Sequence, residues 1–380
     1  MRRKKIKWIF TAVAILLAVL LGSVIPDDDL SERAIAVGFG IDLDERGEVV
    51  VSAQILSASD SGDSGVGTRV VTAQGKLLDT AVSNITETCG KTLTVTHCNV
   101  VLLGKTLIEQ GMTFPVLMTL LTNTYISDNA YIFACDGSPE DVFLSQSAFG
   151  QNASQYLQQL ISMYGTYENI TYKTLREIIV DSYNIGKATY MPYLTKKPVD
   201  PKIPPSTSYE EIKDKSDYSF DLNHVVVLKD SVLQGVYGND ALRAINYLLT
   251  EVDKGSDDFD VKSGKVGVFV LDNAIKKQYD KENKTFSVKL EIGVTVKDFQ
   301  PSDGKSFAGP YGYQLQGDDK SACETTLKNE IVGFFLEMQQ KDVDVFAVRQ
   351  NFYSRFGPSA LRIPLSDIKF DLQVQLKVKK

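Results

Sequence analysis

The sequence is poor in the residues that carry most enzymatic and metal chemistry. Its 380 residues include two histidines, four cysteines and one tryptophan. The cysteines form no C-x-x-C pair, and the histidines lack a metal-binding spacing. A Ser-His-Asp triad would have to use His97 or His224, and both lie in apolar runs that are typical of strands. We therefore expect no catalytic, metal-binding or cofactor-binding residue, and no enzyme.

Nucleotide-binding and hydrolase motifs are also missing. The sequence contains no G-x-x-x-x-G-K-[ST], no G-x-S-x-G and no H-E-x-x-H. Residues Gly38–Asp42 resemble part of a dinucleotide-binding fingerprint, but strand and turn residues follow where that motif needs a helix. Asp27–Asp29 and Asp253–Asp260 could attract a cation, yet neither has the ligand order of an EF-hand loop. We interpret both acidic segments as solvated loops.

Charge is distributed unevenly along the chain. The first seven residues carry five basic side chains and no acidic one. Because they contribute +5 to a formal net charge of −7, the remaining residues carry −12. Such an acidic body is a poor match for the phosphate backbone of a nucleic acid. We therefore expect no nucleic-acid partner.

A long apolar run follows the basic residues. Residues 8–25 contain only three residues that are not strongly apolar, and a helix of this length spans about 27 Å, close to the hydrocarbon thickness of a bilayer. The basic residues before the run predict that residues 27–380 lie outside the cytosol. The sequence therefore predicts an N-terminal transmembrane or signal-anchor helix.

The end of this run resembles a bacterial lipoprotein signal in which serine replaces the lipid-bearing cysteine. The segment reads Leu20-Leu21-Gly22-Ser23, and a serine hydroxyl is not diacylglycerylated as a thiol is. Leucine is also a poor residue for position −3 of a signal-peptidase site. We favour an uncleaved anchor, with cleavage as the alternative.

The extracytoplasmic location bears on the cysteines. A disulfide is stable outside the cytosol, and Cys89 with Cys98 would close the shortest loop. Free buried thiols are the alternative, which we favour. The sequence does not decide the disulfide state of Cys89, Cys98, Cys135 and Cys323.

Helix and strand patterns alternate through the rest of the chain. Helical periodicity predicts helices near residues 76–89, 105–123, 139–146, 152–163, 173–183, 239–251 and 325–341. Apolar and β-branched runs predict strands in a hairpin at 34–57 and at residues 93–103, 224–229, 231–237, 259–271, 285–298 and 368–378. Loops are expected at Ser57–Thr68 and at 300–320. The last strand alternates strictly, as a half-buried antiparallel strand does.

These patterns predict an α+β fold, in which the anchor precedes two or three mixed α/β domains with mostly antiparallel sheets flanked by helices. The clearest boundary has four prolines and ten charges that cancel, at residues 195–220. The predicted parts are the basic region with the anchor at residues 1–26, an N-terminal domain at 27–195, a Pro-rich linker at 196–220 and a C-terminal domain at 221–380. The N-terminal domain could itself consist of two subdomains.

Tyrosines are concentrated between residues 156 and 193. They could line a binding face, or they could pack within a helical layer. The sequence leaves both interpretations open for Tyr156, Tyr164, Tyr167, Tyr172, Tyr183, Tyr190 and Tyr193.

Short motifs along nearly the whole chain resemble, in order and spacing, the Ger(x)C family, the C subunits of spore nutrient-germinant receptors. The motifs and their positions are E-R-A-I…G-x-G-I-D at Glu32–Asp42, V-S-A-Q-I at Val51–Ile55, T-H-x-x-V-V-L-L-G at Thr96–Gly104, L-I-E-Q-G at Leu107–Gly111, M-P-Y-L at Met191–Leu194, the hairpin V-V-V-L-K-D-S-V-L-Q-G at Val225–Gly235 and D-V-F at Asp344–Phe346. The chain departs from the family at two places. Ser23 stands where the lipidated cysteine belongs, and Phe346-Ala347-Val348 replaces a glycine-bearing pattern.

The resemblance implies a non-enzymatic ectodomain at the outer face of the spore inner membrane, built from several α/β domains. It also implies partners, namely a polytopic A subunit and a transporter-like B subunit, in nutrient-triggered germination. The alternative is a membrane-anchored extracytoplasmic ligand-binding or envelope-sensing module unrelated to spores. A secreted hydrolase, which would need His97 or His224 in a polar cleft, is the least favoured interpretation.

Overall fold

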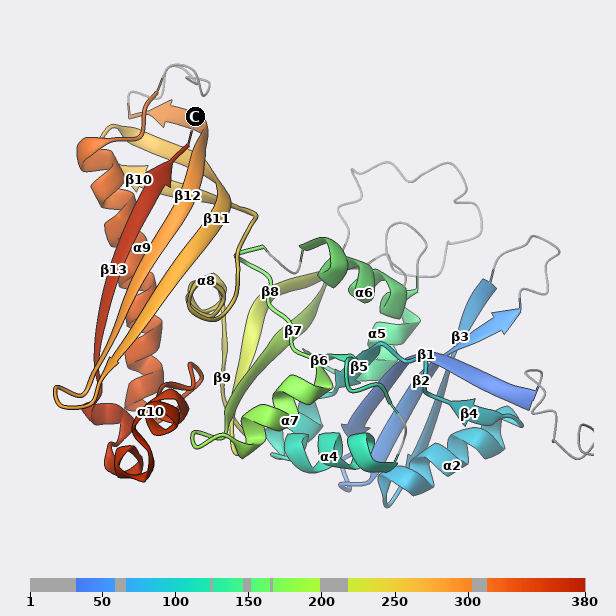
Figure 1. Cartoon of the computed structure of the whole chain (residues 1–380). Coiled ribbons are helices and arrows are strands. Elements are labelled where there is room, and N and C mark those ends of the chain that lie inside the picture. The colour runs from blue at the N-terminus through green and yellow to red at the C-terminus, as the bar shows by residue number, and fades with distance from the viewer. Residues whose placement is uncertain are drawn as a thin grey trace, which may run out of the picture.

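The structure is a computed structural model that describes residues 32–58, 66–123, 126–145, 152–164, 167–198, 218–302 and 313–379. The expected anchor at residues 8–25 and most of the Pro-rich stretch lie outside these residues. The described residues form two β-sheets with flanking helices, a mixed α/β fold (Figure 1). No helix among them is both long and apolar enough to cross a membrane.

The first sheet has the spatial order β3-β2-β1-β5-β6-β7-β8-β9, with β4 paired to β1. Its strands are β1 (Arg33–Leu43), β2 (Val49–Ala58), β3 (Val66–Gly75), β4 (Thr92–Thr94), β5 (Val100–Leu103), β6 (Tyr131–Cys135), β7 (Ala188–Pro198), β8 (Tyr218–Lys229) and β9 (Val232–Tyr237). The strands at the two sides of the sheet pair with their neighbours antiparallel, whereas the central strands β1, β5, β6 and β7 pair in parallel. The expected mostly antiparallel arrangement is therefore wrong at the centre, because helical crossovers return the chain to the same end of the sheet.

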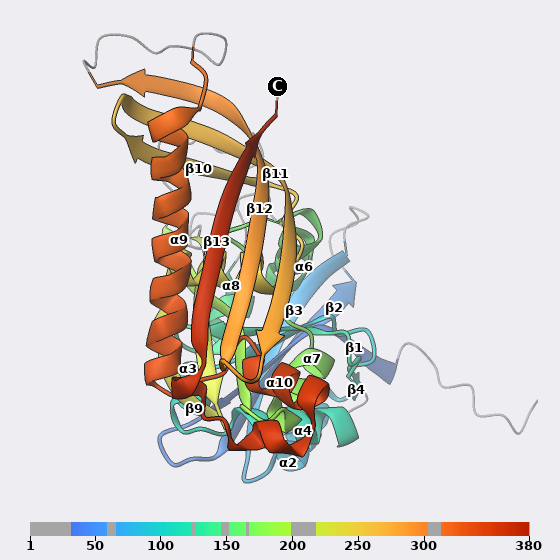
Figure 2. The ribbon, with the colours of Figure 1, turned by 60° about the vertical axis from the view of Figure 1, so that its left-hand side comes forward.

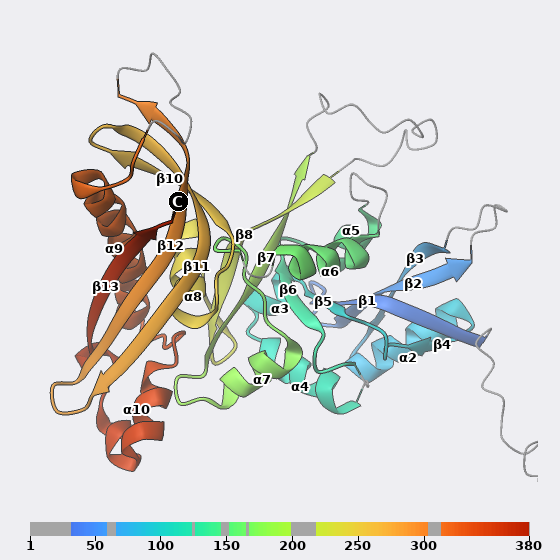
Figure 3. The ribbon, with the colours of Figure 1, turned by 45° about the horizontal axis from the view of Figure 1, so that its top comes forward.

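Helices cover both faces of the first sheet (Figure 3). One face packs against α2 (Leu78–Cys89), α3 (Lys105–Glu109), α4 (Thr113–Asn123) and α7 (Leu175–Tyr183), and the other against α5 (Pro139–Leu144) and α6 (Ala153–Tyr164). Neighbouring residues of β5 accordingly belong to different cores, Val101 to the first and Leu102 to the second. This double burial explains why the central strands are continuous apolar runs.

The second sheet has the order β10-β11-β12-β13. Its strands are β10 (Gly255–Val261), β11 (Gly264–Asp280), β12 (Thr285–Pro301) and β13 (Lys369–Val378), with α8 (Asn239–Leu249), α9 (Gly317–Gln340), α10 (Val348–Phe356) and the 3₁₀ helices η3 (Pro358–Arg362) and η4 (Leu365–Asp367). Helix α9 runs along one face (Figure 2). Strand β13 is parallel to β12, so the antiparallel prediction is wrong. The α9–α10 crossover is the reason, because it reverses the chain once more before β13 begins.

The two sheets share a core on either side of α8. Helix α8 lies between them (Figure 1), and its residues pack together with residues of β7, β8 and the second sheet. Strand β8 follows the Pro-rich stretch and pairs with β7, which precedes it. The first sheet therefore continues beyond residues 196–220, and the division of the chain into domains there stays a prediction.

Most predicted helices are present, but two predictions before residue 125 are wrong in detail. The strand expected at 93–103 is divided into β4 and β5, because the Cys98 amide donates to the Val95 carbonyl and closes a turn. The helix expected at 105–123 is divided into α3 and α4. Gly111 has a φ of 72°, the left-handed conformation that ends a helix.

Two strand boundaries also differ from the sequence prediction. Strand β3 begins at Val66, inside the loop expected at Ser57–Thr68, because its Val- and Thr-rich residues pair with β2. The single strand expected at 259–271 is divided between β10 and β11, because the turn that joins them falls within these residues. Gly264 allows that turn with a φ of 153°.

Candidate functional site

The two histidines and the four cysteines do not form a reactive site. His97 is exposed in a turn, where a strand was expected, and His224 lies in β8 without a hydrogen-bond partner for Nδ1. A catalytic triad needs that nitrogen to be oriented by a carboxylate. All four cysteines are free thiols. Loss of hydration raises the pKa of Cys98 and of Cys323 to about 12, so these two thiols carry little of the nucleophilic thiolate form at neutral pH.

The tyrosine-rich stretch does not form a single face. Tyr156 packs against Phe220, with 5.6 Å between ring centroids, and Tyr172 contacts Tyr131 edge-on at 5.7 Å. Tyr183, at the end of α7, is 74% exposed. These described side chains lie on separate elements, so they do not form one binding face, and packing accounts for Tyr156, Tyr172 and the buried Tyr190.

Charged side chains of the first sheet gather where its parallel strands end. Lys105 follows β5 and Asp136 follows β6, and the Lys105 Nζ lies 3.1 Å from the Asp136 Oδ1. Hydrogen bonds from the Lys105 ammonium, and then from the Tyr193 hydroxyl, lower the pKa of the Asp136 carboxyl group. The carboxyl ends of parallel strands are where ligands bind in open α/β sheets. We call Lys105, Asp136 and Tyr193 the carboxyl-edge cluster.

Asp42, at the end of β1, positions α3 behind this cluster. Its buried carboxylate accepts hydrogen bonds from the Leu43 amide at 2.8 Å and the Leu107 amide at 2.9 Å. Burial raises the pKa of Asp42, and these hydrogen bonds oppose the rise. Gly104 permits the approach, because a Cβ there would lie 2.0 Å from the Asp42 Cγ. Asp42 therefore has a structural role in fixing the start of α3.

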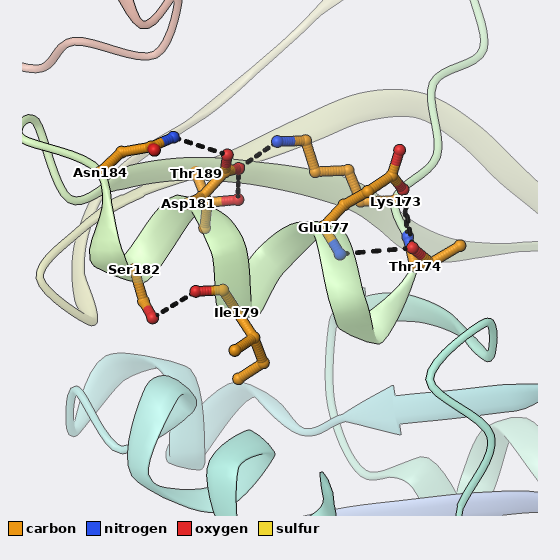
Figure 4. Close-up of polar contacts among 8 residues, drawn as sticks. All are labelled: Lys173, Thr174, Glu177, Ile179, Asp181, Ser182, Asn184 and Thr189. Carbon is orange, nitrogen blue, oxygen red and sulfur yellow. Dashed lines mark hydrogen bonds and ion pairs between the residues drawn. The ribbon is translucent and has the colours of Figure 1, made fainter. Parts of the chain in front are cut away.

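A second cluster of polar side chains links α7 to β7 (Figure 4). The Asp181 carboxylate accepts from the Lys173 ammonium, from the Thr189 hydroxyl at 2.6 Å and from the Asn184 amide at 3.4 Å. The Lys173 Nζ also lies 4.2 Å from the centre of the buried Tyr190 ring. These contacts fix the end of α7 and the turn that follows it.

That turn belongs to a junction between the two sheets at which backbone strain is concentrated. The residues with positive φ there are Lys187, Asp230, Ser231, Asp342 and Ala347. The Asp230 amide donates to the Lys187 carbonyl at 2.8 Å, and the Lys229 ammonium lies 2.8 Å from the Asp342 carboxylate. Non-glycine residues in this conformation cost of order 1–3 kcal/mol and persist only when the surroundings enforce them. The contacts of the junction therefore hold these residues in an unfavourable backbone conformation.

A buried ionic cluster forms another contact between the sheets. Arg243 of α8 pairs with Asp257 of β10 and, at 2.7 Å, with Glu330 of α9. The Tyr247 hydroxyl donates to Glu168, which precedes α7. The side-chain amide of Asn246, also in α8, donates to the Glu168 carbonyl at 2.8 Å. These contacts make α8 the connection between the two sheets.

Comparisons with known proteins agree with this architecture. Residues 27–196 match the family model described as the spore germination protein N-terminal domain. No curated protein matches the chain. The solved structure titled "Crystal Structure of the GerBC protein" matches 90% of this chain and 97% of that chain, with a TM-score of 0.54 and 14% identity. This likeness confirms the mixed α/β fold. Residues 27–196 are similar to the N-terminal domain of spore germination proteins, in agreement with the predicted Ger(x)C family.

Proposed function

We propose that this chain is the non-catalytic C subunit of a spore germinant receptor, acting with polytopic A and B subunits in nutrient-triggered germination. The family match over residues 27–196 carries the proposal. The structure is compatible with it, because the buried carboxylate of Asp42 and the half-buried charges of Asp181 and Arg243 cap helices or join elements. Groups used in this way build a rigid scaffold for binding partner subunits.

We also propose that residues 8–25 anchor the chain in the spore inner membrane, with both sheets outside the cytosol. The five basic residues before this run support this orientation, because basic flanks stay on the cytoplasmic side. The anchor would keep the scaffold at the membrane surface, where membrane-embedded subunits can contact it.

Deletion of the gene is expected to abolish germination triggered by nutrients and to leave germination by non-nutrient agents intact. The reason is that a receptor subunit acts only on the nutrient signal. The measurement is the loss of optical density of purified spores after each trigger, with the deletion complemented by the intact gene as the control. A normal nutrient response in a strain without paralogous receptors would contradict the proposed function.

The anchor has its own test at Ser23. The parent chain is expected to keep its full length in spore membranes, because serine provides no thiol for lipidation. The Ser23→Cys variant is expected to gain a lipid label in cells fed a labelled fatty acid. A parent chain that lacks residues 1–22, as judged by intact mass, would show that the segment is a cleaved signal.

A further inference from the structure

A cavity of about 610 Å³ lies at one edge of the second sheet, and none of the roles above explains it. Strand β10 pairs with β11 only as far as Val270, so residues 272–280 of β11 have no neighbouring strand on that side within the described part of the chain. The hairpin that joins β11 to β12 lies beside α10 (Figures 1 and 3). Residues of this hairpin and Arg355 of α10 line the cavity.

Two basic side chains line the cavity, and neither forms an ion pair with a described residue. Lys277 of β11 is half-buried. Burial lowers the pKa of its ammonium group, and no described carboxylate opposes this effect. The Arg355 guanidinium lies 4.7 Å from the centre of the Tyr279 ring. Because Lys277 and Tyr279 are two positions apart in one strand, both positive charges lie on the face of β11 that carries this ring.

Neutral hydrogen-bond donors complete the lining. The Gln278 amide and the Ser287 hydroxyl belong to residues that pair across β11 and β12, and neither side chain has a hydrogen-bond partner among the described residues. Asp280 also lines the cavity, but its carboxylate accepts from the Asn283 backbone amide at 3.0 Å and from the Asn283 side-chain amide at 2.8 Å. The lining therefore has one excess positive charge and several donors that could bind an anion.

The hairpin is basic, although the chain as a whole is acidic. Residues 276–284 contain four lysines and two acidic residues, whereas the whole chain has a formal net charge of −7. A lysine at the edge of a sheet often serves only to discourage pairing with another strand. That role explains the exposed Lys276, which lies on the opposite face of β11. It does not explain the half-buried Lys277, whose charge loses hydration without gaining a partner.

We propose that this cavity binds a phosphate ester, with the phosphate group held by Lys277 and Arg355. A guanidinium forms bidentate hydrogen bonds with phosphate, and an ammonium group adds a point charge. Gln278 and Ser287 can donate to other oxygen atoms of the ester, and its organic part packs on the Tyr279 ring. A soluble phosphate ester and a phospholipid headgroup share this chemistry. The inference is independent of the proposed function, because the cavity lies outside residues 27–196.

The test is calorimetric titration of the purified full-length chain with glycerol 3-phosphate at constant ionic strength. Glycerol, which lacks the phosphate, and glycerate, which has a carboxylate in its place, are each expected to bind at least about tenfold more weakly, because charged hydrogen bonds are lost. Dihexanoyl phosphatidylglycerol, a soluble phospholipid, distinguishes the two sources. Binding at least as tight as that of glycerol 3-phosphate assigns the site to a lipid headgroup, and weaker binding assigns it to a soluble ester.

Two variants locate the binding. Lys277→Met and Arg355→Met are each expected to weaken the binding of glycerol 3-phosphate at least about tenfold, because each removes a charged hydrogen bond. The matched control is Lys276→Met, which removes the same charge from the adjacent residue, outside the cavity lining. Its affinity should stay close to that of the unaltered chain. Thermal unfolding of each variant confirms that it is folded.

Four results would each overturn the proposal. The unaltered chain could show no binding heat with either phosphate compound, or it could bind glycerol or glycerate as tightly as glycerol 3-phosphate. A folded Lys277→Met or Arg355→Met variant could keep the affinity of the unaltered chain, which would leave Lys277 as an edge lysine without a ligand. Finally, Lys276→Met could lose as much affinity as Lys277→Met, which would show a general attraction of anions to the basic hairpin.

Discussion

Replacing Arg243 by alanine is expected to lower the free energy of unfolding by about 3–5 kcal/mol. The guanidinium pairs with Asp257 and Glu330 in the core between the sheets. Without it, the buried Asp257 carboxylate and the half-buried Glu330 carboxylate would face one another with no opposite charge. The measurement is the urea unfolding midpoint of the variant relative to the unaltered chain.

The matched control is Arg176→Ala. Arg176 also pairs with an aspartate, Asp128, but its side chain is 63% exposed, so the loss should stay below about 1 kcal/mol. The double variant Arg243→Ala/Asp257→Asn should recover part of the stability, because it removes one of the unpaired charges. A loss for Arg243→Ala no larger than that for Arg176→Ala would show that the cluster does not stabilise the connection.

The same cluster gives the stability a pH dependence. Burial, and then the nearby Glu168, raise the pKa of Asp257 to about 7, although Arg243 opposes the rise. The folded chain therefore holds the proton of the Asp257 carboxyl group more tightly than the unfolded chain does, and this protonation stabilises the fold. The stabilisation is fully present below about pH 4 and is lost as the pH rises through about 7. In melting curves between pH 5 and 8, the unaltered chain should therefore lose more stability than Asp257→Asn, whose side chain stays neutral. Equal slopes would contradict the assignment.

The local structure could largely be predicted from the sequence, because its signals are local. Helix α5, for example, begins with local signals, because the Ser138 hydroxyl accepts from the Asp141 amide and Pro139 stands in the first turn. The hairpin turn at Lys229–Asp230 is also present, between β8 and β9. Strand alternation near the C-terminus predicted β13 but not its parallel pairing. Alternation reports which face of a strand is buried, and the neighbour depends on the path of α9 and α10.

The carboxyl-edge cluster was missed for a similar reason. Lys105 and Asp136 are 31 positions apart in the sequence, and only the parallel pairing of β5 with β6 places them side by side. Strand β6 itself was not predicted, since it is short and lies between helical patterns. The available signal was that a short apolar run ends in Gly104-Lys105 and another in Asp136-Gly137. Two such ends become informative once their strands are known to be parallel.

The motif G-x-G-I-D at residues 38–42 is where the largest packing effect is expected. Its glycines lie in β1 beneath α5, and a Cβ on Gly40 would lie 2.3 Å from the Pro139 Cβ. A Cβ on Gly38 would lie 2.0 Å from the Ser154 Oγ. Both neighbours are held in place, because the Gln54 amide donates to the Phe143 carbonyl and accepts from the Ser154 amide, each at 3.1 Å. The helices therefore cannot move away from an added side chain without breaking these bonds.

Gly40→Ala is accordingly expected to destabilise the chain by about 3 kcal/mol, the upper part of the usual range for overpacking. Gly67→Ala is the matched control, because Gly67 also lies in a strand but its Cβ would meet nothing closer than the Ser57 carbonyl at 3.8 Å. That variant should be neutral or slightly stabilising. Urea unfolding of both variants makes the comparison. If Gly40→Ala were as stable as Gly67→Ala, the motif would need an explanation other than packing. If Gly40→Ala unfolds at a lower urea concentration, the two glycines are needed for the close approach of α5 and α6, and Asp42 fixes the start of α3. The likeness to a dinucleotide-binding fingerprint then reflects tight packing without a nucleotide.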